Sequence, residues 1–162
     1  MSKVRSKLVV ASCLAWLLGS STAVASGLYG GIGGLHTNFE DAQDDSQVGL
    51  RVYGGYDFFQ VSAAFRVGIE AGYTRTGSFD TVDSANGTAR QDNGDVGLQA
   101  TFTALRPLAF HARVGHEWGD SEGTIFALGG SIKAFPLTRI RADYQFRNDY
   151  DAAMLSIEVR LP

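Results

Sequence analysis

The chain has 162 residues, 44% apolar and 19% charged, so it is long enough for one domain and too polar for a bundle of transmembrane helices. Aromatic residues make up 11%, which is too many for a disordered chain, and a single cysteine excludes a disulfide framework. Twenty glycines against three prolines favour β-structure with tight turns.

The first 25 residues have the pattern of a cleavable signal peptide. Three basic residues precede an apolar run from Leu8 to Leu18, and small residues follow. We expect cleavage between Ala25 and Ser26, with residues 26–162 forming one exported domain. A retained membrane anchor would need a longer apolar run. Cleavage removes three of the 14 basic residues and leaves a net charge of −6.

After Ala25, apolar and polar residues alternate with period two in eight segments. These segments cover residues 27–35, 48–58, 65–74, 96–103, 110–118, 126–133, 139–147 and 155–161. Glycines blur the alternation in the first segment. Strands of about ten residues cross a bilayer when they are tilted, so the pattern predicts eight transmembrane strands.

The links between these segments alternate in character. We expect long or acidic links at residues 36–47, 76–91, 119–122 and 148–151, and short links at 59–62, 105–108 and 135–137. Two short links contain proline, which fixes a turn. Outer-membrane barrels have short periplasmic turns and longer external loops, so this arrangement predicts that both termini are periplasmic.

Alternation alone does not decide which face lies inside, because a soluble ligand-binding barrel turns its apolar face inward. Three features favour the inverted, membrane arrangement. The polar face is rich in glycine, which makes room for arginine side chains in a narrow lumen. The apolar face carries aromatic residues near the strand ends, as lipid interfaces select. Both signs of charge occur on the polar face and can neutralise one another in a closed lumen.

These features predict an ionic network inside the barrel and two aromatic girdles outside it. The network comprises Arg51, Arg66, Glu70, Arg113, Glu117, Arg141, Asp143, Glu158 and Arg160. The girdle at the short-link end contains Phe58, Phe65, Phe102 and Phe110; the other contains Tyr73, Trp118, Phe126, Tyr144 and Phe146. The interior of an eight-stranded barrel is just filled by side chains, so we expect a closed lumen.

The strand residues 27–34, 52–56, 68–73 and 141–146 resemble those of the small OmpA-like and opacity-type outer-membrane proteins. The resemblance implies an all-β, eight-stranded, antiparallel up-and-down transmembrane β-barrel in the outer membrane of a diderm (Gram-negative) bacterium. Family members bind surfaces, resist host defence or stabilise the envelope, so the fold is better determined than the function. Two departures are that no peptidoglycan-binding domain follows the barrel and that the last residues, Leu161 and Pro162, are not aromatic.

No motif predicts a catalytic site, a cofactor or a metal. Lipid A deacylases, which resemble this fold, place histidine and serine two residues apart on the lipid face; His116 fits, but position 118 is Trp118. His111 lies among the luminal charges, where we expect a hydrogen-bonded structural histidine. Three histidines without cysteine form no metal-ligand pattern. The acidic mature chain gives no support for a nucleic-acid partner.

We therefore expect a non-enzymatic, monomeric surface protein that acts through its loops or as an envelope component. Its partners would be outer-membrane lipid, lipopolysaccharide, the barrel-assembly machinery and a host or cell-surface ligand. Eleven of the 17 acidic residues fall in or beside the long links, and Glu40, Asp41, Asp44 and Asp45 form the candidate interaction site. The alternatives are a lipid A-modifying enzyme, a soluble ligand-binding barrel, and acidity that only keeps the loops soluble.

Overall fold

The computed structural model describes residues 27–39, 46–60, 62, 64–76, 79–80, 88–89, 91–148 and 150–161. The expected signal peptide and its cleavage site at Ala25 and Ser26 lie outside the described residues, as do Glu40, Asp41, Asp44 and Asp45. Within the described part, no helix is long and apolar enough to cross a membrane.

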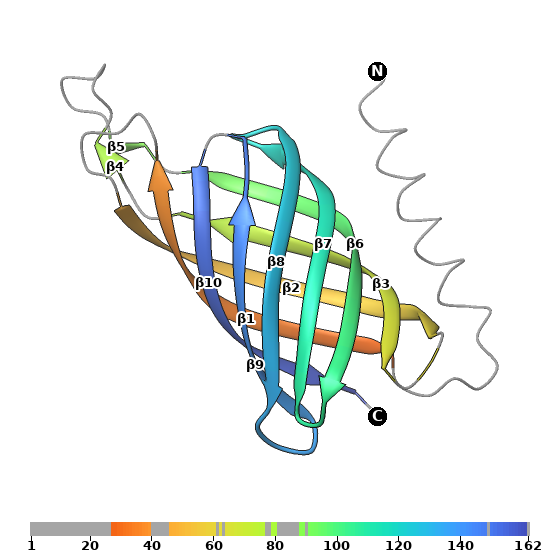
Figure 1. Ribbon diagram of the computed structural model, residues 1–162. Coiled ribbons are helices and arrows are strands. Elements are labelled where there is room, and N and C mark those ends of the chain that lie inside the picture. The colour runs from red at the N-terminus through yellow and green to blue at the C-terminus, as the bar shows by residue number, and fades with distance from the viewer. Residues whose placement is uncertain are drawn as a thin grey trace.

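Eight strands close into one antiparallel barrel in the order β1-β10-β9-β8-β7-β6-β3-β2 (Figure 1). The strands are β1 (Leu28–Phe39), β2 (Ser46–Gln60), β3 (Phe65–Arg75), β6 (Asp92–Leu105), β7 (Leu108–Gly119), β8 (Gly123–Lys133), β9 (Thr138–Phe146) and β10 (Tyr150–Arg160). Closure pairs β1 with β10, so no strand edge is left with unpaired backbone groups, as a lipid environment requires. This confirms the predicted fold.

The links differ from the prediction in three respects. The link after β3 contains a small two-stranded ribbon, β4 (Phe79–Asp80) with β5 (Thr88–Ala89), at the end of the barrel opposite the C-terminus (Figure 1). The expected link at 36–47 is shorter, because β1 extends to Phe39 and β2 begins at Ser46. The acidic links expected at 119–122 and 148–151 are found at residues 120–122 and 147–149, and Asp151 belongs to β10. We call the end of the barrel that carries the β4–β5 ribbon the loop end. We call the end with the β2–β3, β6–β7 and β8–β9 connections the short-turn end.

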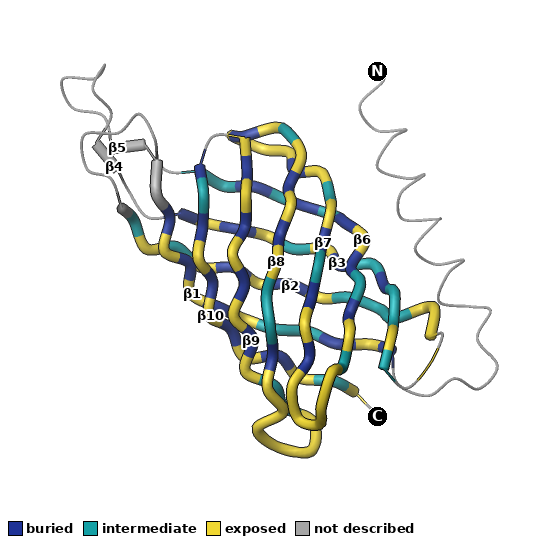
Figure 2. Tube along the Cα trace, in the orientation of Figure 1, coloured by how far each residue is buried: buried dark blue, intermediate teal, exposed yellow. Residues whose placement is uncertain are grey.

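Burial alternates along the strands (Figure 2), and most of the buried positions are polar, including every large charged side chain of the lumen's centre. The apolar residues Leu98, Val114 and Ile157 are 52–55% exposed on the outer surface, whereas Arg51 and Arg113 are at most 1% exposed. A water-soluble protein buries its apolar side chains instead. The outer surface is therefore the lipid-facing one, and the soluble barrel is excluded.

Strand register aligns the aromatic girdles across neighbouring strands. At the short-turn end, Phe65 of β3 lies opposite Phe102 of β6, which lies opposite Phe110 of β7. At the loop end, Phe126 lies opposite Phe146, whose ring also meets the ring of Tyr144 edge-on at 4.9 Å. All six side chains are exposed on the wall. Such rows are typical of the two interfaces of a bilayer.

Glycines on the two faces have different surroundings. A Cβ at the inward-facing Gly72 would lie 2.5 Å from the Arg51 guanidinium, so this glycine makes room for a luminal arginine. A Cβ at Gly55 would lie 2.7 Å from the Ile69 carbonyl oxygen and closer still to the Tyr29 ring. A Cβ at the outward-facing Gly54 would meet nothing nearer than the Tyr29 carbonyl oxygen at 3.6 Å. Packing therefore requires glycine at Gly72 and Gly55 but not at Gly54.

Adjacent glycines on β2 test this difference. We predict that Gly55→Ala lowers the free energy of unfolding by about 1–3 kcal/mol, because the new methyl group must displace Tyr29 or the β3 backbone. Gly54→Ala should be neutral or stabilising by up to about 1 kcal/mol, since its site is open and glycine weakens a strand. Urea unfolding in lipid vesicles measures both. Equal effects of the two variants would contradict the assigned faces.

A second test concerns the wall. Val114 lies halfway along β7, between Phe110 and Trp118 of the two girdles. Val114→Arg should cost about 2–4 kcal/mol in unfolding free energy, because arginine near the bilayer midplane loses its hydration. Val114→Leu is the control and should change the stability by less than about 1 kcal/mol. An arginine variant as stable as the leucine variant would show that Val114 does not face lipid.

Candidate functional site

The centre of the lumen is a cluster of three arginines and three carboxylates built around Glu70 of β3. The Glu70 carboxylate lies 3.1 Å from Arg51 Nη1, 2.7 Å from Arg141 Nη1 and 3.5 Å from Arg113 Nη1. Arg51 also pairs with Asp95 at 2.7 Å, and Arg113 pairs with the same Asp95 oxygen. Arg141 holds Asp143 at 2.6 Å. All six side chains are at most 1% exposed, so the cluster fills this part of the lumen.

Two further groups of charges lie toward the ends of the lumen. Near the loop end, Glu117 pairs with Arg147. Near the short-turn end, Arg160 bridges Asp57 at 2.6 Å and Glu158 at 2.8 Å, and Arg66 lies 3.6 Å from Asp57. Glu158 also lies 3.5 Å from Arg141, which joins this group to the central cluster. The structure thus brings all nine expected network residues into luminal ion pairs.

The expected network omits three residues that the structure places in it. Asp57 binds Arg66 and Arg160, Asp95 binds Arg51 and Arg113, and Arg147 is the partner of Glu117. The sequence does indicate that Asp95 faces the lumen. It lies two and four residues before the inward-facing Gly97 and Gln99, so all three are on the same face of the strand. The predicted segment begins at Val96, four residues after the first residue of β6, and therefore leaves Asp95 out.

Aromatic rings pack against the luminal arginines. The guanidinium groups of Arg51 and Arg141 lie 5.1 and 5.2 Å from the centroid of the Tyr53 ring, and that of Arg160 lies 4.6 Å from the Tyr29 ring. Such cation–π contacts stabilise buried guanidinium groups. The Tyr29 hydroxyl donates to Glu70 at 3.4 Å and accepts from Gln99 at 3.2 Å.

The two histidines of β7 lie on opposite faces. His111 is buried in the lumen between Thr101 Oγ1 at 3.1 Å and Ser131 Oγ at 2.8 Å, as a structural histidine would be. His116 faces outward, directly opposite Thr124 of β8. Among the described residues, no three His, Cys, Asp or Glu side chains come together where they could hold a metal ion.

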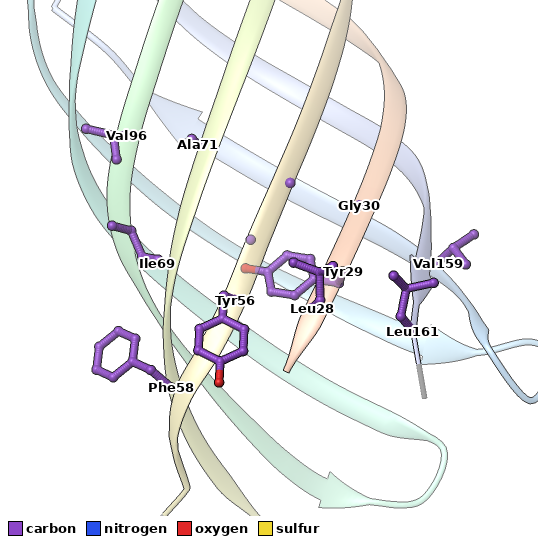
Figure 3. A pocket seen from close by; sticks show the side chains of 12 residues that line it. Leu28, Tyr29, Gly30, Tyr56, Phe58, Ile69, Ala71, Val96, Val159 and Leu161 are labelled. Atoms are coloured by element: carbon purple, nitrogen blue, oxygen red, sulfur yellow. The ribbon is translucent and has the colours of Figure 1, made fainter. Parts of the chain in front are cut away.

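The outer wall is hollowed by an apolar groove of about 690 Å³ (Figure 3). Strand register creates it: Gly30, Gly54 and Ala71 lie opposite one another across β1, β2 and β3. The next outward-facing row toward the short-turn end is Leu28, Tyr56 and Ile69. No charged residue lines the groove, so it offers a hydrocarbon surface on the lipid-facing wall.

Acidic residues gather at the loop end. Asp120 and Glu122 are exposed, whereas Asp92 and Asp151 are half-buried. Asp92 pairs with Arg75 at 3.3 Å, Asp120 accepts the Asp92 N–H at 2.8 Å, and Asp151 accepts the Tyr144 hydroxyl at 3.0 Å. These contacts fix the strand ends beneath the loops.

A closed eight-stranded barrel with an apolar outer wall and a charged, filled lumen defines a transmembrane barrel of the outer-membrane type. Residues 20–157 match the family model of the OmpA-like transmembrane domain, and the chain belongs to this family. No curated protein matches the sequence.

Solved structures share the fold at low sequence identity. A de novo designed transmembrane β-barrel has a TM-score of 0.58 and 13% identity, covering 86% of this chain and 98% of that chain. Ail, the attachment invasion locus protein of Yersinia pestis, has a TM-score of 0.56 and 16% identity, covering 84% and 97%. At such identities the likeness shows the fold alone.

The central cluster gives a stability prediction. Glu70→Gln keeps the side-chain shape but removes the carboxylate that neutralises three buried guanidinium groups, so we expect a loss of about 3–5 kcal/mol in unfolding free energy. Glu122→Gln is the control, because Glu122 is exposed and should change stability by less than about 0.5 kcal/mol. Urea unfolding in vesicles measures both. A Glu70 variant as stable as the control would show that this cluster does not stabilise the barrel.

Proposed function

We propose that this protein is a non-enzymatic surface protein of the outer membrane that recognises its partners through an acidic loop end. The proposal rests on the division of its acidic residues between the lumen and the loop end. Six of them face the lumen, where each lies in an ion pair: Asp57, Glu70, Asp95, Glu117, Asp143 and Glu158. The other 11 acidic residues of the sequence belong to the links and strand ends at the loop end. Because the outer wall faces lipid and the lumen is filled with side chains, only the two ends of the barrel are available for recognition.

The loop end faces the outside of the cell in this proposal. Both ends of the described barrel, Gly27 and Leu161, lie at the short-turn end, where the Gly27 carbonyl accepts the Asp57 N–H and the Leu28 carbonyl accepts the Leu161 N–H. Outer-membrane barrels keep short turns in the periplasm and longer loops outside. Protease treatment of intact cells should therefore cut the loops and leave both termini intact.

The charge of the loop end selects the class of partner. An acidic surface attracts basic surfaces, or divalent cations that bridge it to lipopolysaccharide phosphates, and repels anions. The structurally similar Ail has been solved with the heparin analogue sucrose octasulfate, an anionic ligand. We expect the opposite preference here, because four acidic residues and no basic residue occupy the link at 40–45.

A lipid A-modifying enzyme is the alternative function, and the outward-facing His116 opposite Thr124 is the observation behind it. Mass spectra of lipid A from cells with and without the protein distinguish the two functions. Identical spectra are expected for a surface-recognition protein, and a deacylated product in the expressing cells would contradict a non-enzymatic role.

Neutralising the first loop tests the recognition proposal. Replacing Glu40, Asp41, Asp44 and Asp45 by Gln and Asn should leave the barrel folded and weaken binding to immobilised polylysine by about tenfold at low salt, because long-range attraction falls with loop charge. Binding is measured by biolayer interferometry with the protein in phosphatidylcholine nanodiscs. These contain no lipopolysaccharide, so its negative charge does not contribute to binding. Immobilised heparin should bind neither form.

The matched control replaces two acidic residues of the next long link, Asp80 and Asp83, by Asn. Its loss of binding should be smaller than that of the first-loop variant. If the first-loop variant binds polylysine as the parent does, or if the parent binds heparin more tightly than polylysine, the proposed acidic recognition surface is wrong.

A further inference from the structure

We propose that the short-turn mouth of the lumen binds an anionic group of the phosphate class. The balance of luminal charge points to this site. In the central cluster, three arginines face three carboxylates, and near the loop end Arg147 faces Glu117. Near the short-turn end, however, there are three arginines and only two carboxylates. Asp57 and Glu158 pair with Arg66 and Arg160, and Arg139 pairs with neither. One positive charge is therefore in excess there.

The excess charge resides on Arg139 of β9. Within the described part of the chain, its polar contact is a 3.4 Å hydrogen bond from Nη1 to Ser131 Oγ, and no carboxylate lies within ion-pair distance. Glu158 lies directly opposite Arg139 on β10, but its carboxylate is engaged by Arg160 at 2.8 Å and Arg141 at 3.5 Å. Asp57 is likewise held by Arg160 and Arg66.

A second cation adds to the excess. On the other side of Arg139, Lys133 of β8 is its direct cross-strand partner, and like charges placed directly opposite repel each other. Lys133 is exposed and Arg139 half-buried, so this pair lies where the lumen opens to solvent. An anion between them would remove the repulsion.

Unused hydrogen-bond donors lie beside this pair. Arg66 Nε and Arg160 Nη2 are buried and have no acceptor among the described residues, although their side chains are 17% and 13% exposed at the mouth. Guanidinium groups bind phosphate and carboxylate oxygens through charge-assisted hydrogen bonds. Two surplus charges match a phosphate group, whose charge near neutral pH is between −1 and −2. The source is either inorganic phosphate or a phospholipid headgroup.

Inorganic phosphate is the probe for this site. It is titrated into the folded protein in a zwitterionic detergent and followed by ³¹P NMR, with sodium chloride at matched ionic strength as the salt control. We expect saturable binding that Arg139→Gln and Lys133→Gln each weaken by about tenfold, the effect of one lost charge-assisted contact. Arg75→Gln is the matched control, because Arg75 is an exposed arginine at the loop end.

Two results would overturn the site: binding no stronger than that of chloride, or variants of Arg139 and Lys133 that bind as Arg75→Gln does. Lys133 is exposed, so its variant carries the test even if the Arg139 variant does not fold. Short-chain phosphatidylglycerol, added to the protein in a phosphate-free detergent, separates the two sources. If it competes with inorganic phosphate and Arg139→Gln abolishes the competition, the site takes a lipid phosphate; absence of competition identifies free phosphate as the ligand.

Discussion

The pairing of Glu70 with three arginines is the interaction on which the rest of this barrel depends. Charges removed from water must be neutralised and hydrogen-bonded, and the lumen of a membrane-embedded barrel offers no other solution. Seven arginines are packed there with six carboxylates. Their bulk fills the space that apolar side chains occupy in a soluble protein, so the apolar residues of the same strands lie outside, against lipid.

This filling also explains where glycine and tyrosine occur. The missing side chain of Gly72 leaves room for the Arg51 guanidinium, and that of Gly55 leaves room for the Tyr29 ring. Tyr53 and Tyr29 place their rings against arginines and so stabilise the buried guanidinium groups. The outward glycines, Gly30 and Gly54, serve no such purpose and instead hollow the lipid-facing wall. Glycine thus has two roles in this barrel, and the face of the strand on which it lies determines which role it has.

A filled lumen confines function to the two ends, which differ in charge. The links at the loop end are rich in acidic residues, whereas at the short-turn end the cations Arg139 and Lys133 have no carboxylate partner among the residues that the structure describes. Recognition by the loops and anion binding at the opposite mouth are independent proposals, since they use residues at opposite ends of the strands. A designed barrel shares this fold as closely as Ail does, so the fold by itself does not specify a function.

The sequence by itself determined the strands, their faces and the girdles, because period-two alternation is a local property that each strand shows alone. It also placed Arg51, Glu70 and Arg141 in the lumen. Only the tertiary structure decided that Glu70 joins three arginines, that Glu117 takes Arg147, and that Arg139 has no carboxylate. These pairings join residues up to 103 positions apart, as Arg160 and Asp57 show. They depend on barrel closure and on the register between strands, which no single segment encodes.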